Sequence, residues 1–196
     1  MRKSLPLLLA LCSFSSLVCL DGCAQLMGDK DNEPGDPVGV YTLNAVVDVG
    51  SSSCPEVVAA APNPWTFQVT LRRDGTTGYW LSGADPLQGT IADTGAITFT
   101  ATIPTPVHDV EKAKGVGACT IDRTDQFSGS FAGDPSTDAG KASFSGTLVY
   151  MYAVESGSDC SDVVGQPSED DPTPLFSVIP CTVKFNVTAT KTGDAQ

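Results

Sequence analysis

Few side chains in this 196-residue sequence have the types and spacing that catalysis requires. His108 is the only histidine, so a Ser-His-Asp triad would have to use it as the general base. Asp109 and Glu111 lie beside it, but the sequence contains no GxSxG motif that would place a nucleophilic serine. We therefore expect His108 to be an exposed loop residue, and the protein not to be an enzyme.

Carboxylates are concentrated in one segment near the C-terminus. Paired acids could hydrolyse a glycosidic bond, and an oxygen-rich loop could bind calcium. The segment is also rich in proline and serine, which is typical of a solvated loop. We expect neither a metal ion nor another cofactor, and a hydrolase is the third of three functional hypotheses. The six carboxylates are Glu155, Asp159, Asp162, Glu169, Asp170 and Asp171.

The seven cysteines fall into two groups. Three lie in or just after an apolar run at the start of the chain, at Cys12, Cys19 and Cys23. Four more are spread over the rest of the chain, at Cys54, Cys119, Cys160 and Cys181. Within this second group no pair has CxxC spacing, and a single histidine argues against a zinc site. An even set of cysteines in an exported protein predicts two disulfides.

The start of the chain has the layout of a bacterial export signal. Arg2 and Lys3 precede an apolar run from Leu5 to Leu20, and small residues follow. A membrane-spanning helix is the alternative, but a span needs about 20 apolar residues. This run is shorter, contains Pro6 near its start and is interrupted by serines.

The sequence Leu20-Asp21-Gly22-Cys23 resembles the lipobox of bacterial lipoproteins. The resemblance implies a signal peptide over residues 1–22, cleavage before Cys23, and acyl chains on the Cys23 sulfur and amine. Ala24 stands where an aspartate would retain such a protein at the inner membrane, so the resemblance implies the outer membrane. Each buried CH₂ of an acyl chain contributes about 0.8 kcal/mol, so several chains together anchor stably. The expected partner of Cys23 is the lipid bilayer.

The composition excludes one class of partner. Removal of residues 1–22 takes away Arg2, Lys3 and Asp21, which leaves 9 basic and 22 acidic residues and a net charge of −13. Binding to nucleic acid depends on neutralising phosphates with lysine and arginine. A chain this acidic has no such electrostatic attraction, so we expect no nucleic acid partner.

The elements that would position these residues are predicted to be strands. Residues 23–38 are charged and punctuated by glycine and proline, which indicates a flexible acidic tether. Apolar and polar residues then alternate with a period of two, which is typical of half-buried antiparallel strands. We expect a β-barrel domain over 39–191, with no long helix. Its eight strands are predicted at 39–49, 65–73, 77–82, 87–92, 96–103, 118–131, 142–154 and 178–190.

These strands favour a single antiparallel meander that closes as an up-and-down barrel. The layout, though no sequence motif, is similar to lipocalin-like and avidin-like proteins. A β-sandwich is the alternative, because Cys54, Trp65 and Cys119 roughly match the Cys, Trp, Cys spacing of immunoglobulin domains. That family carries a tyrosine two residues before its second cysteine, where this sequence has Gly117.

In the meander, the long loops 50–64, 104–117 and 155–177 lie at one end, and all four later cysteines lie with them. Neighbouring strand ends are close enough for disulfides, whose Cα atoms are about 5.5 Å apart. Adjacency in a closed barrel favours Cys54 with Cys181 and Cys119 with Cys160. A bridge between Cys160 and Cys181 is nearly as easy.

An eight-stranded barrel can be filled by side chains or can hold one small ligand. Many rings occupy alternating apolar positions, so we expect a packed interior and a non-catalytic lipoprotein that presents a rigid barrel to an unknown envelope protein. The alternative is a carrier of a small apolar ligand, which a cavity of about 300 Å³ or more with inward polar groups would favour. The residues predicted at the barrel mouth or interior are Trp65, Trp80, Phe99, Phe127, Phe144, Tyr150 and Tyr152.

Overall fold

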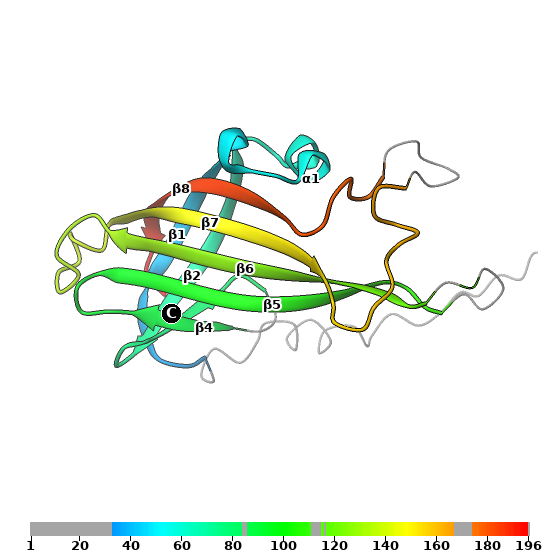
Figure 1. Ribbon diagram of the computed structural model, residues 1–196. Coiled ribbons are helices and arrows are strands. Elements are labelled where there is room, and N and C mark those ends of the chain that lie inside the picture. Colours follow the sequence, from blue (N-terminus) through cyan, green and yellow to red (C-terminus); the bar gives the residue numbers. More distant parts are fainter. Residues whose placement is uncertain (1–32, 84–85, 111–114, 116, 167–173, 196) are drawn as a thin grey trace, which may run out of the picture. The chain divides into compact units, whose positions relative to one another are not determined.

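The described residues of the computed structural model form one closed barrel of eight antiparallel strands (Figure 1). They are residues 33–83, 86–110, 115, 117–166 and 174–195. The predicted all-β meander is confirmed, and the pairing of the first strand with the last replaces the sandwich alternative. The strands are β1 (Asp36–Val47), β2 (Trp65–Asp74), β3 (Thr77–Leu81), β4 (Leu87–Ile91), β5 (Ala96–His108), β6 (Cys119–Phe131), β7 (Ser143–Val154) and β8 (Cys181–Gly193).

The expected signal peptide, Cys23 and most of the expected tether lie outside the described residues. β1 begins at Asp36, three residues before the predicted barrel domain, and there pairs with Arg73 of β2. The first long loop contains a 3-10 helix (Val49–Ser51) and the six-residue helix α1 (Pro55–Ala60). Pro55 suits the first helical position, because the missing N–H would have no partner there.

The largest difference from the predicted strands is in β5, which continues to His108 where a loop was expected from residue 104. Pro104 and Pro106 suggested that loop, yet they pair with Asp122 and Thr120 of β6. Proline has no N–H to donate, so it is tolerated on a strand edge that faces no further strand. The two prolines therefore mark an edge and not the end of the strand.

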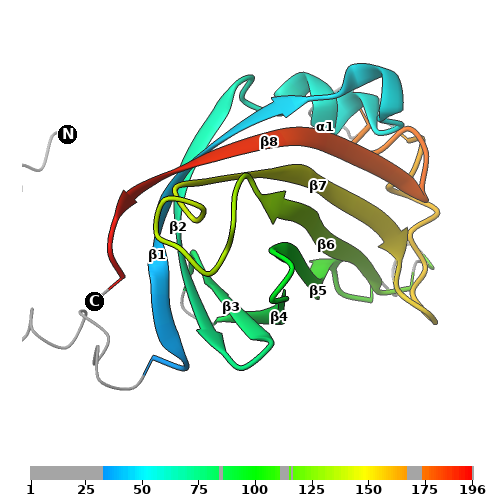
Figure 2. The same ribbon diagram turned by 90° about the vertical axis from the view of Figure 1, so that its left-hand side faces the viewer.

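The barrel has two distinct ends. The short β2–β3 and β4–β5 turns and the β6–β7 connection lie at one, which we call the turn end, and Figure 2 shows the ring of strands from that side. β1 begins there and β8 finishes there, with Val40 paired to Gly193. The longer connections after β1, β5 and β7 lie at the other, which we call the loop end.

The ring of strands is complete only toward the turn end. β3 pairs with β2 from Thr70 to Asp74, and β4 pairs with β5 only from Ile97 to Phe99. Toward the loop end, the described pairings give residues 65–69 of β2 and 100–108 of β5 a partner on one side only. We call the space between these two edges the lateral gap. It arises because β3 and β4 have five residues each, whereas the other strands have 10 to 13.

Large ring side chains pack against one another in the turn-side part of the barrel. Tyr41 is fully buried against Phe131 and Phe144, with ring centroids 6.4 and 5.0 Å away. Its hydroxyl donates to the carbonyl of Lys141 at 2.9 Å, so the buried polar atom is satisfied. Glycines let the strands approach here: a Cβ on Gly146 would lie 2.4 Å from the Ser128 carbonyl oxygen.

Two disulfides close the loop end. Cys54 bonds to Cys181 and Cys119 bonds to Cys160, with Cα atoms 5.2 and 4.8 Å apart. The favoured pairing is confirmed. Each joins a loop to the start of a strand, because Cys181 and Cys119 are the first residues of β8 and β6.

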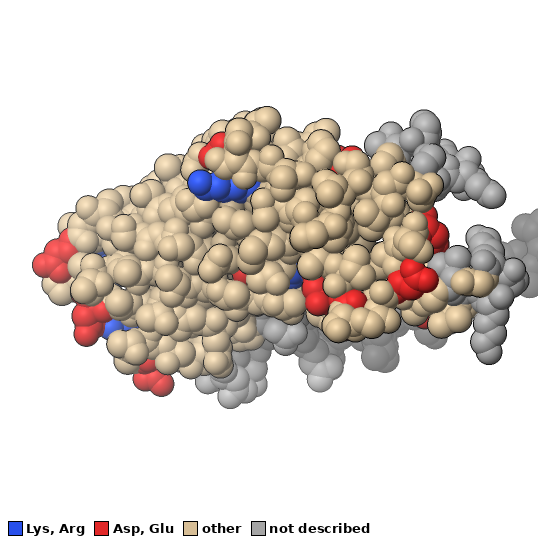
Figure 3. Space-filling model, in the orientation of Figure 1, with Lys and Arg blue, Asp and Glu red and all other residues tan. Residues whose placement is uncertain are grey.

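On the face in Figure 3, acidic side chains gather toward the two ends, and the region between them is largely uncharged. Among the described residues, no helix has the length and hydrophobicity that crossing a bilayer requires.

Candidate functional site

A cavity of about 280 Å³ opens inside the loop-side part of the barrel, beside the lateral gap. We call it the aromatic pocket. Its volume is close to the lower limit for small-molecule sites, about 300 Å³. Gln68, which faces outward on the edge of β2, borders it, so the pocket reaches that edge. The lining residues are Trp65, Phe67, Gln68, Trp80, Ser82, Leu87, Phe99, Arg123, Asp125, Phe127, Leu148 and Tyr150.

Ring side chains form most of the pocket wall. Trp65 and Phe67 project from alternate positions of β2 and stack, with centroids 4.2 Å apart. The ring of Trp80 of β3 packs against those of Phe99 and Phe127, with centroids 5.5 and 5.3 Å apart. The indole N–H of Trp80 donates to the Ser82 hydroxyl at 3.2 Å, which satisfies its one donor. The wall is therefore apolar and held in place by ring packing.

One ion pair faces into this apolar space. Arg123 and Asp125 are two residues apart on β6, so both side chains lie on the inner face. Arg123 donates from Nε to Oδ1 of Asp125 at 2.7 Å and from Nη2 to Oδ2 at 2.9 Å. Its guanidinium also lies over the Tyr150 ring, 5.0 Å from the centroid. The aspartate side chain is 14% exposed and the arginine side chain 38%, so the acid is the more deeply buried partner.

Burial and pairing act on the pKa of Asp125 in opposite directions. Burial raises the pKa above its ordinary value, because a carboxylate loses solvation, and the neighbouring Arg123 lowers it. Burial prevails, so the pKa of Asp125 is raised overall. For Arg123, burial would lower the pKa, but the bonds to Asp125 more than offset this and the pKa is raised. Burial likewise raises the pKa of the Tyr150 phenol.

Most of the residues predicted for the mouth or interior meet in this pocket. Trp65, Trp80, Phe99, Phe127 and Tyr150 all line it. Phe144 instead packs deeper, in the turn-side part, where it is 2% exposed.

Tyr152 packs against Phe176 from the last long loop, with ring centroids 5.2 Å apart. The expectation of a packed interior is therefore wrong at the aromatic pocket, whereas the rings of Tyr41, Phe131 and Phe144 pack against one another toward the turn end.

Sequence reasoning missed the polar residues of the pocket. Arg123 and Asp125 share odd numbers with Ile121 and Phe127, whose side chains are buried on the inner face of β6. Parity along a strand was the available signal, because residues two apart share a face. The prediction considered only apolar residues at inward positions, so it did not include Arg123 and Asp125.

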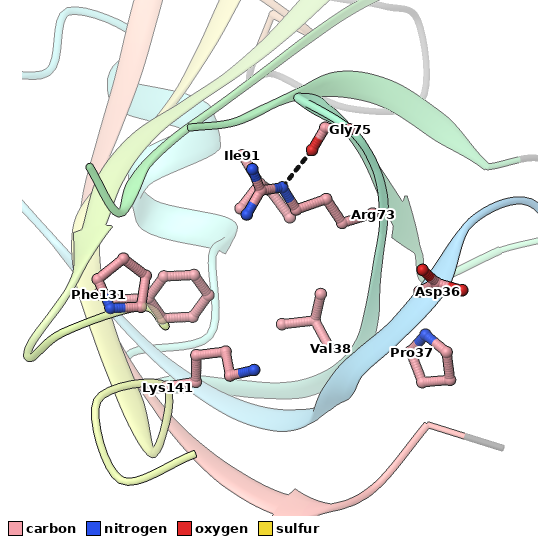
Figure 4. A pocket seen from close by; sticks show the side chains of 9 residues that line it. Asp36, Pro37, Val38, Arg73, Gly75, Ile91, Phe131 and Lys141 are labelled. Carbon is pink, nitrogen blue, oxygen red and sulfur yellow. Dashed lines mark hydrogen bonds between the residues drawn. The ribbon is translucent and has the colours of Figure 1, made fainter. Parts of the chain in front are cut away.

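A second cavity, of about 290 Å³, opens at the turn end (Figure 4). Arg73 from β2 and Lys141 from the β6–β7 connection reach into it from facing sides. Arg73 pairs with Asp93, and the Lys141 Nζ atom lies 3.5 Å from Asp138. Both cations are therefore compensated by exposed acids, and this cavity has none of the clustered rings of the aromatic pocket.

His108 was expected to be an exposed loop residue, but it is the last residue of β5 and its side chain is 18% exposed. Its Nε2 contacts the Asp162 carboxylate at 3.2 Å and its Nδ1 contacts the Asp109 carbonyl at 2.9 Å. A catalytic histidine must keep one ring nitrogen for the nucleophile, and both nitrogens here face oxygen acceptors. Residues 169–171 of the acidic segment lie outside the described residues. In the part that the structure describes, no three potential metal-binding side chains come together.

No protein-family model, curated protein or solved structure matches this chain.

Proposed function

We propose that the protein is a lipid-anchored binding protein of the bacterial envelope, and that its barrel holds a small ring-containing ligand. One observation carries the proposal: a cavity of about 280 Å³ that combines stacked rings with the inward ion pair of Arg123 and Asp125. Ligand sites combine an apolar wall with a few placed polar groups. A barrel that served only as a rigid scaffold would gain stability from filling this space.

The anchoring half of the proposal rests on the resemblance of Leu20 to Cys23 to a lipobox. The chain joins the barrel at Asp36, at the turn end. The lateral gap and the aromatic pocket lie toward the opposite end of the strands.

One preparation tests both halves. The full chain is extracted from the membranes of its own host and weighed intact, first under denaturing and then under native conditions. We expect acyl chains on a polypeptide that begins at Cys23, and a stoichiometric small molecule that is lost on denaturation. An unmodified chain with another start contradicts the anchor, and a chain that carries no small molecule contradicts the binding function.

A pair of variants locates the bound molecule. Leu87→Trp places a large ring at the pocket margin, and Gln88→Trp places the same ring on the outer face of the same strand. We expect the first to abolish the bound mass and the second to retain it. Equal retention by both would mean that the molecule binds elsewhere.

A further inference from the structure

The shape of the aromatic pocket favours a flat ligand. Trp65 and Phe67 are stacked at an interplanar angle of 29°, and Trp80 lies against Phe127. The volume of about 280 Å³ equals roughly nine waters at the liquid volume of about 30 Å³ each. Two fused rings with one substituent fit this space.

The hydrogen-bond donors that Arg123 still has available favour a ligand that carries an acceptor. A guanidinium has five N–H donors and no acceptor. Arg123 uses two of them on Asp125, from Nε and Nη2. Its side chain is 38% exposed and lines the cavity, so further N–H groups are open to a ligand. An oxygen acceptor on the ligand would meet them.

The positive charge of Arg123 is already balanced by Asp125, which favours an uncharged acceptor on the ligand. Asp125 already compensates Arg123 through two hydrogen bonds. A carboxylate ligand would add a second negative charge beside the buried Asp125, and like charges in such a site oppose each other. An amide or ring carbonyl would accept the same hydrogen bond without losing the solvation of an ion.

On the basis of the proposed function, we infer that the ligand is a flat, uncharged ring compound whose carbonyl-type oxygen accepts a hydrogen bond from Arg123. Asp125 then acts as a specificity residue, because it sets the charge that the pocket tolerates. Its removal is expected to turn the preference toward anions.

Three related probes test this inference: naphthalene, naphthalene-2-carboxamide and naphthalene-2-carboxylate. The full chain is reconstituted in lipid nanodiscs, with empty nanodiscs as the background, and binding is measured by calorimetry. Quenching of intrinsic fluorescence locates the probe, because both tryptophans of the chain, Trp65 and Trp80, line the pocket. We expect the amide to bind about tenfold more tightly than naphthalene, as a hydrogen bond to a charged group allows. The carboxylate should bind more weakly than the amide.

Two variants separate charge from shape. Asp125→Asn removes the compensating charge, and we expect the carboxylate then to bind more tightly than the amide. Asp122→Asn removes the same charge from the outer face of the same strand, and we expect it to keep the order of the unmodified chain.

The outcomes distinguish a failure of the proposed binding function from a failure of the inferred ligand class. Failure of all three probes to bind would contradict the proposed function itself. Equal affinity for all three, or tighter binding of the carboxylate by the unmodified chain, would retain a ring-binding pocket and overturn the inference about ligand class. That comparison needs no variant, so it holds even where Asp125→Asn fails to fold.

Discussion

The two halves of the barrel differ in what surrounds their inward side chains. In the turn-side half, Tyr41, Phe131 and Phe144 contact one another and are buried. In the loop-side half, Trp65 and Tyr150 face a cavity and are only partly buried. Strands β1, β2, β6, β7 and β8 run through both halves, so the difference does not come from separate elements.

Strand length explains the difference. β3 and β4 complete the ring in the turn-side half and end before the loop-side half begins. In the part of the chain that the structure describes, Trp65 and Phe67 of β2 therefore have a cross-strand partner on one side only. The aromatic pocket therefore lies where two short strands leave the ring open, whereas the cavity of the turn-side half lies at the turn end itself.

The two halves also differ in what holds them together. The turn-side half relies on close packing of large side chains. At the loop end, the disulfides fix the loops to the strand starts, and the Ser53 backbone N–H donates to the Thr182 carbonyl at 2.7 Å. Side chains stabilise one half, and covalent bonds compensate for thinner packing in the other.

The largest expected effect comes from removing a disulfide. The Cys54–Cys181 bridge spans 127 residues and the Cys119–Cys160 bridge spans 41. The loop-entropy relation gives roughly 5 kcal/mol for the longer loop and roughly 4 kcal/mol for the shorter. We expect Cys54→Ala with Cys181→Ala to reduce the free energy of unfolding more than Cys119→Ala with Cys160→Ala.

Urea denaturation of the two double variants measures this order. If neither pair changes the free energy of unfolding, the loop-side half does not depend on its covalent bonds. A larger loss for the shorter loop would point to native-state contacts, and not to loop length, as the main contribution of these bridges.

Two substitutions of phenylalanine compare the packing of the halves. Phe144→Ala leaves a void among buried rings, for which we expect a loss of about 3–5 kcal/mol in the free energy of unfolding. Phe67 is half-buried beside an existing cavity, so Phe67→Ala should cost roughly 1–1.5 kcal/mol, the transfer term alone. Denaturant melts of both variants check the ratio. Similar losses would mean that the loop-side rings are as tightly packed as those of the turn-side half.

Much of the fold could be predicted from the sequence because alternation is a local property. The inward face of β8 follows from Val183, Phe185 and Val187, which need no knowledge of the rest of the chain. The end at which the cysteines gather follows from counting strand directions. Four cysteines allow three pairings, and adjacency of β8 with β1 and of β6 with β7 favoured the one found.

The hollow part could not be predicted in this way. Whether Phe67 has a neighbour depends on the pairing of β2 with β3, which is a property of two strands and the turn between them. The extension of β5 through Pro104 and Pro106 was missed for the same reason, because only the absent partner strand makes those prolines tolerable. Arg123 and Asp125 were missed because charged residues are usually exposed, although their odd-numbered positions on β6 face inward.

The smallest expected effect concerns pH and the ion pair of the hollow half. Burial raises the pKa of Asp125, so this carboxyl begins to gain a proton above the ordinary aspartate value of about 3.9. Once protonated, it no longer compensates Arg123, and an anion can take its place. Naphthalene-2-sulfonate stays ionised throughout this range, so we expect its affinity to rise about tenfold as the pH falls from neutral through the titration of Asp125, with uptake of a proton, because one charge pair contributes on the order of 1.4 kcal/mol.

The other titratable groups beside the Arg123–Asp125 pair do not change charge in this pH range. Tyr150 and Tyr152 have raised pKa values and stay neutral, and Arg123 stays charged. Falling pH also protonates exposed acids elsewhere on the chain, which favours any anion. Asp125→Asn measures that general contribution, because the variant keeps every other acid, and we expect its affinity to change far less with pH. A variant whose affinity rises as steeply as that of the unmodified chain would show that the acidic surface, and not the pocket, controls anion binding.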